Sequence, residues 1–106
     1  MEQQEKLTVL LIEPACYPKT IEIEPGLEAL QKAVGGWIEA VYPWEDKAAI
    51  IVNEEGKLDQ LPLNRALRTE EGEIYDITAG NMLIVGLGEE DFSSLTKDQL
   101  AHYEKL

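Results

Sequence analysis

A single α+β domain is the fold class that the sequence predicts, with a mixed β-sheet, a ββα start, helices over one face and a C-terminal amphipathic helix. With 106 residues, 44 % of them hydrophobic, the chain suits one modest core and is too apolar for a disordered protein. Its apolar runs are short and bounded by Pro and Gly, as in strands separated by turns. We expect residues 1–6 to form a polar N-terminal tail and residues 7–106 to form the domain.

The first two runs predict a β-hairpin. Residues 7–13 are rich in Leu, Val and Ile and end at Pro14, which favours a strand. Residues 19–24 alternate, so that Ile21 and Ile23 face a core while their polar neighbours face water.

A helix follows this hairpin. Leu27, Leu30 and Val34 recur at helical spacing, which predicts that all three lie on its buried side. Gly35 and Gly36 then supply the left-handed backbone that commonly ends a helix.

A second hairpin is predicted next. Residues 37–42 alternate between two faces, residues 48–53 form a continuous apolar run, and residues 43–47 have the length of a hairpin loop. The following turn ends at Gly56, which we expect to adopt a positive φ.

The remaining strands are shorter. Pro62 excludes a central strand from residues 57–68, so we expect a loop with one helical turn there. A turn at residues 69–73, a short extended piece at 74–77 and a last strand at 82–85 complete the sheet.

The C-terminal segment carries a helix start signal. Thr96 and Gln99 have the spacing of a capping box, and Leu95 and Leu100 have that of a hydrophobic staple. A short amphipathic helix is therefore expected, with one apolar side: Leu100, Tyr103 and Leu106.

Charge and targeting signals narrow the function classes. A net charge of −12 opposes direct binding of nucleic acid or anionic membranes and favours a protein partner with a basic surface. Residues 1–6 do not resemble a signal peptide, no apolar stretch has the length of a membrane span, and Cys16 has no disulfide partner within the chain. A cytoplasmic protein is expected, and no oligomeric state follows from the sequence.

Seven segments spread along the chain resemble one known family. They are Gly-Leu-Glu-Ala-Leu-Gln at 26–31, Val-Gly-Gly-Trp-Ile-Glu at 34–39, Val-Tyr-Pro at 41–43, Asn-Glu-Glu-Gly-Lys at 53–57, Asn-Arg-Ala-Leu at 64–67, Gly-Glu-Ile-Tyr-Asp-Ile at 72–77 and Ile-Val-Gly at 84–86. On these segments the chain resembles the bacterial domain-of-unknown-function family numbered 3846. The resemblance implies a small cytosolic protein of Gram-positive bacteria, their phages and conjugative elements, and it assigns no reaction and no catalytic residue.

No catalytic or metal site is expected. His102 is the only histidine and points away from the apolar side of its helix, so it is predicted to face solvent rather than to serve as a base. Cys16 lies in a connecting turn with only Lys19 near it to lower its pKa. The chain has too few Cys and His for zinc, and Gly56 is misplaced for a calcium loop. We therefore expect no cofactor and no enzymatic activity.

One polar patch is a candidate binding site. Asn64 and Arg65 interrupt a leucine-rich stretch, and with Tyr75 they are predicted to form a recognition patch for a carboxylate or a phosphate. The alternative is that Arg65 pairs with a local acid and Asn64 holds a turn.

A second candidate is an acidic surface, because residues 70–96 contain no Lys or Arg. On a single face these carboxylates would imitate the phosphates of a nucleic-acid backbone, whereas the alternative is an ordinary solvated face. The residues are Glu70, Glu71, Glu73, Asp76, Glu89, Glu90 and Asp91.

These observations favour a non-enzymatic accessory or interaction protein of a phage or mobile element. The alternatives are a DNA mimic that inhibits restriction or another nuclease, and a small-molecule-binding module.

Overall fold

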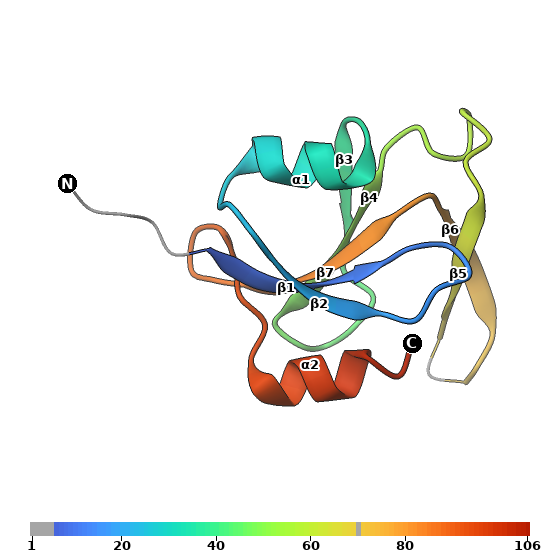
Figure 1. Ribbon diagram of the computed structural model, residues 1–106. Helices are drawn as coiled ribbons and strands as arrows, with labels where there is room; N and C mark the ends of the chain where they lie inside the picture. Colours follow the sequence, from blue (N-terminus) through green and yellow to red (C-terminus); the bar gives the residue numbers. More distant parts are fainter. Residues whose placement is uncertain (1–5, 70) are drawn as a thin grey trace.

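The computed structural model describes residues 6–69 and 71–106 (Figure 1). Residues 1–5 of the expected polar tail lie outside the described residues. The elements follow one another as β1 (Leu7–Ile12), β2 (Lys19–Ile23), α1 (Leu27–Val34), β3 (Ile38–Val41), β4 (Ala48–Asn53), β5 (Leu63–Arg68), β6 (Ile74–Ala79), β7 (Met82–Leu87), β8 (Phe92–Ser93) and α2 (Lys97–Tyr103).

A central sheet holds most of these strands in the order β2-β1-β7-β4-β3, with β8 paired to β7. The α+β class and the ββα start are confirmed. The expected sheet contained both strand orientations, whereas every pairing found is antiparallel. The β1–β2 and β3–β4 pairs are joined by short loops, and β7 runs antiparallel to both β1 and β4.

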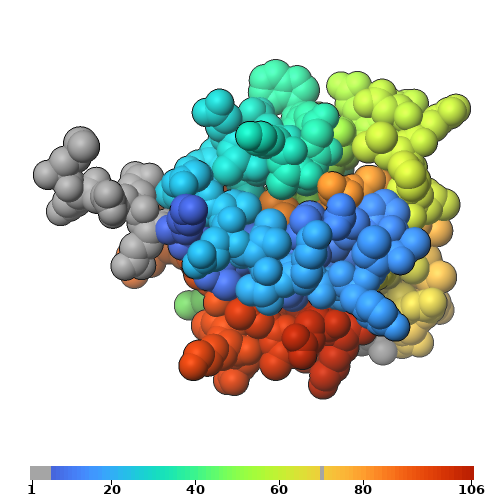
Figure 2. Space-filling model, viewed as in Figure 1, coloured from blue at the N-terminus to red at the C-terminus, as the bar shows by residue number. Residues whose placement is uncertain are grey.

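The helices lie on opposite faces of this sheet (Figure 1), so the expectation that helices cover one face was wrong. On one face Leu30 and Val34 of α1 pack against Ile51 and Leu83, and on the other Tyr103 of α2 packs against the opposite side. The continuous apolar runs of β4 and β7 explain this, because strands buried on both faces need cover on both. In Figure 2 the β1–β2 hairpin fills the front of the molecule between the two helices.

Helix α1 ends as predicted. Gly35 is left-handed, with φ 81°, and its N–H donates to the Gln31 carbonyl. Leu30 and Val34 are buried, but Leu27 is 53 % exposed, so its predicted burial was wrong. As the first residue of the helix, Leu27 lies at the rim of the core beside an open hollow.

Gly56 has a different role from the predicted one. It is not among the glycines with positive φ in the described residues, and Gln60 takes the left-handed conformation in this loop, with φ 56°. A Cβ on Gly56 would lie 2.8 Å from the Ala79 carbonyl oxygen. The absence of a side chain therefore permits close packing of two backbones rather than an unusual φ.

Residues 63–68 form strand β5 rather than the expected loop. This strand pairs only with β6, in a separate two-stranded sheet. The register of the pair shifts twice, between Leu63 and Ala66 and between Leu67 and Arg68. Pro62 is consistent with that arrangement because it directly precedes a strand that has a single partner. One helical turn does precede it, since the Asp59 N–H donates to the Glu55 carbonyl at 2.8 Å.

The end of the chain follows the sequence closely. Residues 82–87 form β7, but the short β8 comes after it, so β7 is not the last strand. The Thr96 and Gln99 capping box is present as predicted. Leu95 is buried, and Leu100 packs against the same core cluster.

Candidate functional site

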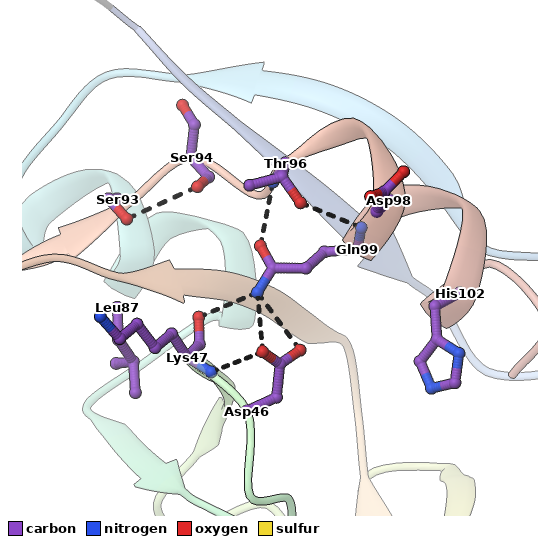
Figure 3. Close-up of a pocket in the computed structure, with 9 residues that line it drawn as sticks. All are labelled: Asp46, Lys47, Leu87, Ser93, Ser94, Thr96, Asp98, Gln99 and His102. Atoms are coloured by element: carbon purple, nitrogen blue, oxygen red, sulfur yellow. Dashed lines mark hydrogen bonds between the residues drawn. The ribbon is translucent and has the colours of Figure 1, made fainter.

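A polar hollow of about 520 Å³ lies beside the start of α2 (Figure 3). The β3–β4 loop forms one wall and the β8–α2 segment forms the other. Its lining residues are Asp46, Lys47, Leu87, Ser93, Ser94, Thr96, Asp98, Gln99 and His102.

Asp46 connects the two walls. Its carboxylate accepts hydrogen bonds from the Tyr103 hydroxyl at 2.5 Å, from the Gln99 side-chain amide at 3.2 and 3.3 Å, and from the Lys47 N–H at 2.7 Å. Gln99 also donates to the Lys47 carbonyl at 3.2 Å. Because these bonds join the β3–β4 loop to α2, Asp46 holds the C-terminal helix on the sheet.

Two pKa shifts follow from this arrangement. The hydrogen bond from Tyr103, then that from the Lys47 N–H, lowers the pKa of Asp46 below its ordinary value of 3.8. Burial, reinforced by the bond to Asp46, raises the pKa of the Tyr103 hydroxyl above its ordinary value of 10.0. At neutral pH Asp46 is therefore an ionised carboxylate that accepts a hydrogen bond from the protonated hydroxyl group of Tyr103.

Tyr103→Phe is expected to lower the free energy of unfolding at pH 7 by about 1 kcal/mol, because it removes one hydrogen bond to a charged but exposed acceptor. Asp46 has a lowered pKa when folded, so its contribution is present above pH 3.8 and is lost as the pH falls through the folded value. Tyr103 has a raised pKa, so its contribution is lost as the pH rises above 10.0.

Chemical denaturation of wild type and Tyr103→Phe at several pH values measures this difference. The difference should shrink below pH 3.8. Tyr42→Phe is the matched control, because its hydroxyl makes no hydrogen bond within the described part of the chain. An equal loss for Tyr42→Phe would contradict the role of the Asp46 bond.

The hollow contains the residue types of a hydrolytic triad without their geometry. Ser93 donates only to the Ser94 carbonyl, at 3.5 Å, and the Asp46 carboxylate is engaged with α2. His102 is exposed, as predicted, and lies edge-on to the Tyr103 ring at 4.9 Å between centroids. Figure 3 shows its imidazole apart from both serines. Within the described residues no hydrogen bond links a nucleophile to a base here.

Asn64 and Arg65 lie together at the start of β5. The Asn64 amide donates to the carbonyls of Ile12 and Gly80, both at 2.8 Å, and its oxygen accepts from Arg65 at 3.0 Å. Arg65 also donates to the main-chain oxygens of Cys16 at 2.6 Å and Leu106 at 3.1 Å. The Arg65 side chain is therefore bonded to main-chain oxygens and to Asn64, and to no Asp or Glu of the described residues, whereas the alternative interpretation expected a local acid.

Tyr75 lies on β6 beside the second register shift of the hairpin and is exposed. It shares no hydrogen bond with Asn64 or Arg65 within the described residues. The structure thus joins two members of the predicted patch and leaves the third on a neighbouring strand. A recognition role for these residues stays a prediction.

The candidate acidic surface is divided. Glu71 and Glu73 lie at the turn of the β5–β6 hairpin, whereas Glu89, Glu90 and Asp91 lie in the β7–β8 turn. Figure 1 shows these two turns at opposite ends of the molecule.

The other two acids add nothing to a common face. Asp76 forms an ion pair with Lys57, and this hydrogen bond lowers the pKa of its carboxyl group. Glu70 lies outside the described residues. The described acids therefore do not form one continuous acidic face.

A groove that the sequence did not indicate runs between the β3 edge of the central sheet and the β5–β6 hairpin. Its volume is about 350 Å³, and apolar side chains from both sheets form much of its wall. We call it the edge groove. Its lining includes the apolar residues Val41, Val52, Leu58, Leu67 and Ile77 and the charged residues Glu39, Glu54, Lys57 and Asp76. In Figure 2 the β4–β5 loop, which carries Leu58, projects from the body of the molecule.

The β3 strand beside this groove has a free edge. The Glu54 N–H donates to the Trp37 carbonyl at 2.8 Å, so by alternation Glu39 and Val41 also bond to β4. The backbone groups of Ile38 and Ala40 therefore point away from the sheet. No other strand in the described residues pairs with β3.

Exposed aromatic side chains flank this free edge. Trp37 is 66 % exposed and Tyr42 is 60 % exposed. Both residues were expected to be the end residues of a strand at 37–42, and they lie just outside the shorter β3. The edge position of β3 was not predicted, because it depends on the order of the strands in the sheet.

Three further features bear on function. Within the described residues, no helix has the length and apolar character needed to cross a membrane. No cluster of three or more potential metal ligands is found among residues 6–69 and 71–106. Cys16 is a free, exposed cysteine.

Comparison with curated proteins and with solved structures finds no significant match. The model of one protein family matches residues 7–106, which is nearly the whole chain. The sequence segments that resemble this family lie on α1, β3, the end of β4, β5, β6 and β7 and in the loops beside them. The chain therefore belongs to the family described as a domain of unknown function, DUF3846.

Proposed function

We propose that this protein is a non-enzymatic interaction module that binds an extended, basic segment of a partner protein along the free edge of β3. The observation that carries the proposal is a free edge strand between two exposed aromatic residues. Natural edge strands are usually blunted by charged side chains, proline or a bulge, and β3 has no proline or bulge and a single charged residue, Glu39. The opposite edge, β2, carries charged residues such as Lys19 and Glu22 on its exposed positions.

Binding by strand addition explains the edge groove as well. Main-chain groups of a partner strand would bond to Ile38 and Ala40, and alternate side chains would reach the groove beside Val41. Tyr42 and Trp37 would provide the large, rigid contact surfaces that dominate many interfaces.

Charge selects the kind of partner. Glu39 and Glu54 line the groove, while Lys57 is already paired with Asp76. A partner segment with basic side chains between apolar ones fits this lining. A second copy of the chain fits poorly, because each copy carries a net charge of −12.

The remaining parts of the proposal rest on the family. A cytoplasmic location and a role in a phage or mobile element are what the family resemblance implies, and gene neighbourhood tests the second. The DNA-mimic alternative has less support, because the acids that it needs on one face lie at two ends of the molecule.

Site-specific photo-crosslinking in native host cells tests the edge. A benzophenone side chain replaces Tyr42, and in a matched control it replaces Tyr17, which is 93 % exposed in the β1–β2 loop. We expect one discrete heterologous adduct from position 42 and none of that mass from position 17. An adduct of two copies of this chain would overturn the proposed partner.

Two variants examine the mode of binding. Ala40→Pro removes an outward N–H without touching the residues that bond to β4, so the adduct should be lost while thermal unfolding still shows a folded protein. Glu39→Lys should weaken capture of a basic segment. An adduct unchanged by both variants would contradict strand addition.

A further inference from the structure

The two arginines of the chain, Arg65 and Arg68, line one cavity of about 370 Å³. It lies between strand β5, the β3–β4 loop and the end of the chain, next to the edge groove, with which it shares Leu67. The wall opposite the arginines is apolar. We call this cavity the arginine pocket; its lining is Pro43, Trp44, Ile50, Arg65, Ala66, Leu67, Arg68, Met82 and Leu106.

Among residues 6–69 and 71–106, no acidic side chain forms an ion pair with the positive charges of this pocket. Within the described residues, each ion pair joins a lysine to an acid, and neither arginine lies within 4 Å of an Asp or Glu oxygen. That is notable in a chain with 21 acids and 9 bases, where an acid is nearly always available. Asp46, two residues after Trp44, directs its carboxylate to α2 instead.

Hydrogen bonds hold both arginine side chains in place but leave some of their N–H donors unused. Arg65 is held by three oxygen acceptors, namely Cys16, Leu106 and the Asn64 side chain. Within the described part of the chain, Arg68 makes one side-chain hydrogen bond, to the Gly72 carbonyl at 3.0 Å. A guanidinium group has five N–H donors, so both groups retain donors for a ligand. The Cys16 and Gly72 carbonyls and the Asn64 amide orient the guanidinium groups without neutralising their charge. The Leu106 oxygen belongs to the last residue, so its carboxylate offsets one of the two positive charges and leaves the other for a ligand.

We infer that the arginine pocket binds a small oxyanion with an apolar body, such as an aromatic carboxylate or a phosphate monoester. The carboxylate or phosphate would bond to the free donors of Arg65 and Arg68, because guanidinium groups recognise such oxyanions with two parallel hydrogen bonds. The body would contact Trp44 and Pro43. The volume lies in the range of small-molecule sites.

Trp44 supplies the signal for a test. Trp37 is the other tryptophan, so Trp37→Phe leaves Trp44 as the single fluorescent indole, inside the pocket. Phenyl phosphate and benzoate are titrated as probes. Two control ligands test the parts separately: inorganic phosphate carries the anionic group without an apolar body, and benzyl alcohol carries the apolar body without an anionic group. We expect saturable changes in Trp44 emission for the first two, with either part alone binding at least about 10-fold more weakly.

Arg68→Gln is the decisive variant, because Arg68 has a single internal hydrogen bond and its loss should leave the fold intact. It should weaken both probes by about 10-fold or more, whereas Lys57→Gln, outside this pocket, should leave them unchanged. Arg65→Gln should also weaken binding, with thermal unfolding measured to separate a loss of fold. No saturable response below about 10 mM, or equal binding by Arg68→Gln, would overturn the inference. This result is independent of partner capture at β3.

Discussion

Leu30→Ala is expected to lower the free energy of unfolding by about 2 to 5 kcal/mol, the usual cost of emptying a buried leucine site. Leu30 is buried beneath α1 against Ile51 and Leu83 of the central strands. Urea denaturation with linear extrapolation measures the change.

The same helix provides a matched control. Leu27 precedes Leu30 by one turn but is largely exposed, so Leu27→Ala should cost less than about 1 kcal/mol. A loss below about 1 kcal/mol for Leu30→Ala, or equal losses for both variants, would mean that α1 does not cover the sheet as described.

Gly86→Ala is expected to destabilise the protein by about 1 to 3 kcal/mol or more, because the new methyl group has no space. A Cβ at this position would lie 2.4 Å from the Ser94 carbonyl oxygen and 2.9 Å from the Ser93 hydroxyl oxygen. Moving this segment away would also disturb the bonds between Thr8 and residues 94 and 95, each 2.9 Å long.

Limited proteolysis distinguishes this local cause from a general one. Gly86→Ala should expose the β8–α2 connection to cleavage before the rest of the sheet unfolds. Gly36→Ala is the control, since the atoms nearest to its Cβ would belong to the Asn53 side chain, at 3.0 Å, and not to the backbone. Cleavage patterns that are the same for both variants would contradict the steric explanation.

The elements that the sequence predicted well have local causes. The two hairpins, α1 and the capping box of α2 each follow from alternation, a glycine stop or a pair of residues three positions apart. Strand β8 was missed because two residues show no periodicity.

Strand β5 was missed for a related reason. Its register shifts disturb the alternation, and only Leu67 of its six residues is buried. A leucine-rich run after a proline therefore looked like a loop.

The candidate sites depended on contacts that local patterns do not contain. Arg65 bonds to residues 49 and 41 positions away, Cys16 and Leu106, so its neighbours were invisible in the sequence. Arg65 and Arg68 were recognisable as an unusual pair, but the facing Trp44 belongs to a distant loop. The free edge of β3 likewise depends on the order of strands.

The central place of β7 has a consequence for how the protein is made. The β1–β2 and β3–β4 hairpins form locally, but neither sheet half has a neighbour until β7 arrives between β1 and β4. Each hairpin therefore remains unpaired along one edge, with its apolar side chains exposed, until the ribosome has synthesised most of the chain. Pairing of such distant segments is slow compared with helix formation. We expect the emerging chain to acquire protease resistance only after residues 82–87 have left the exit tunnel, so that its apolar strands stay exposed during most of synthesis.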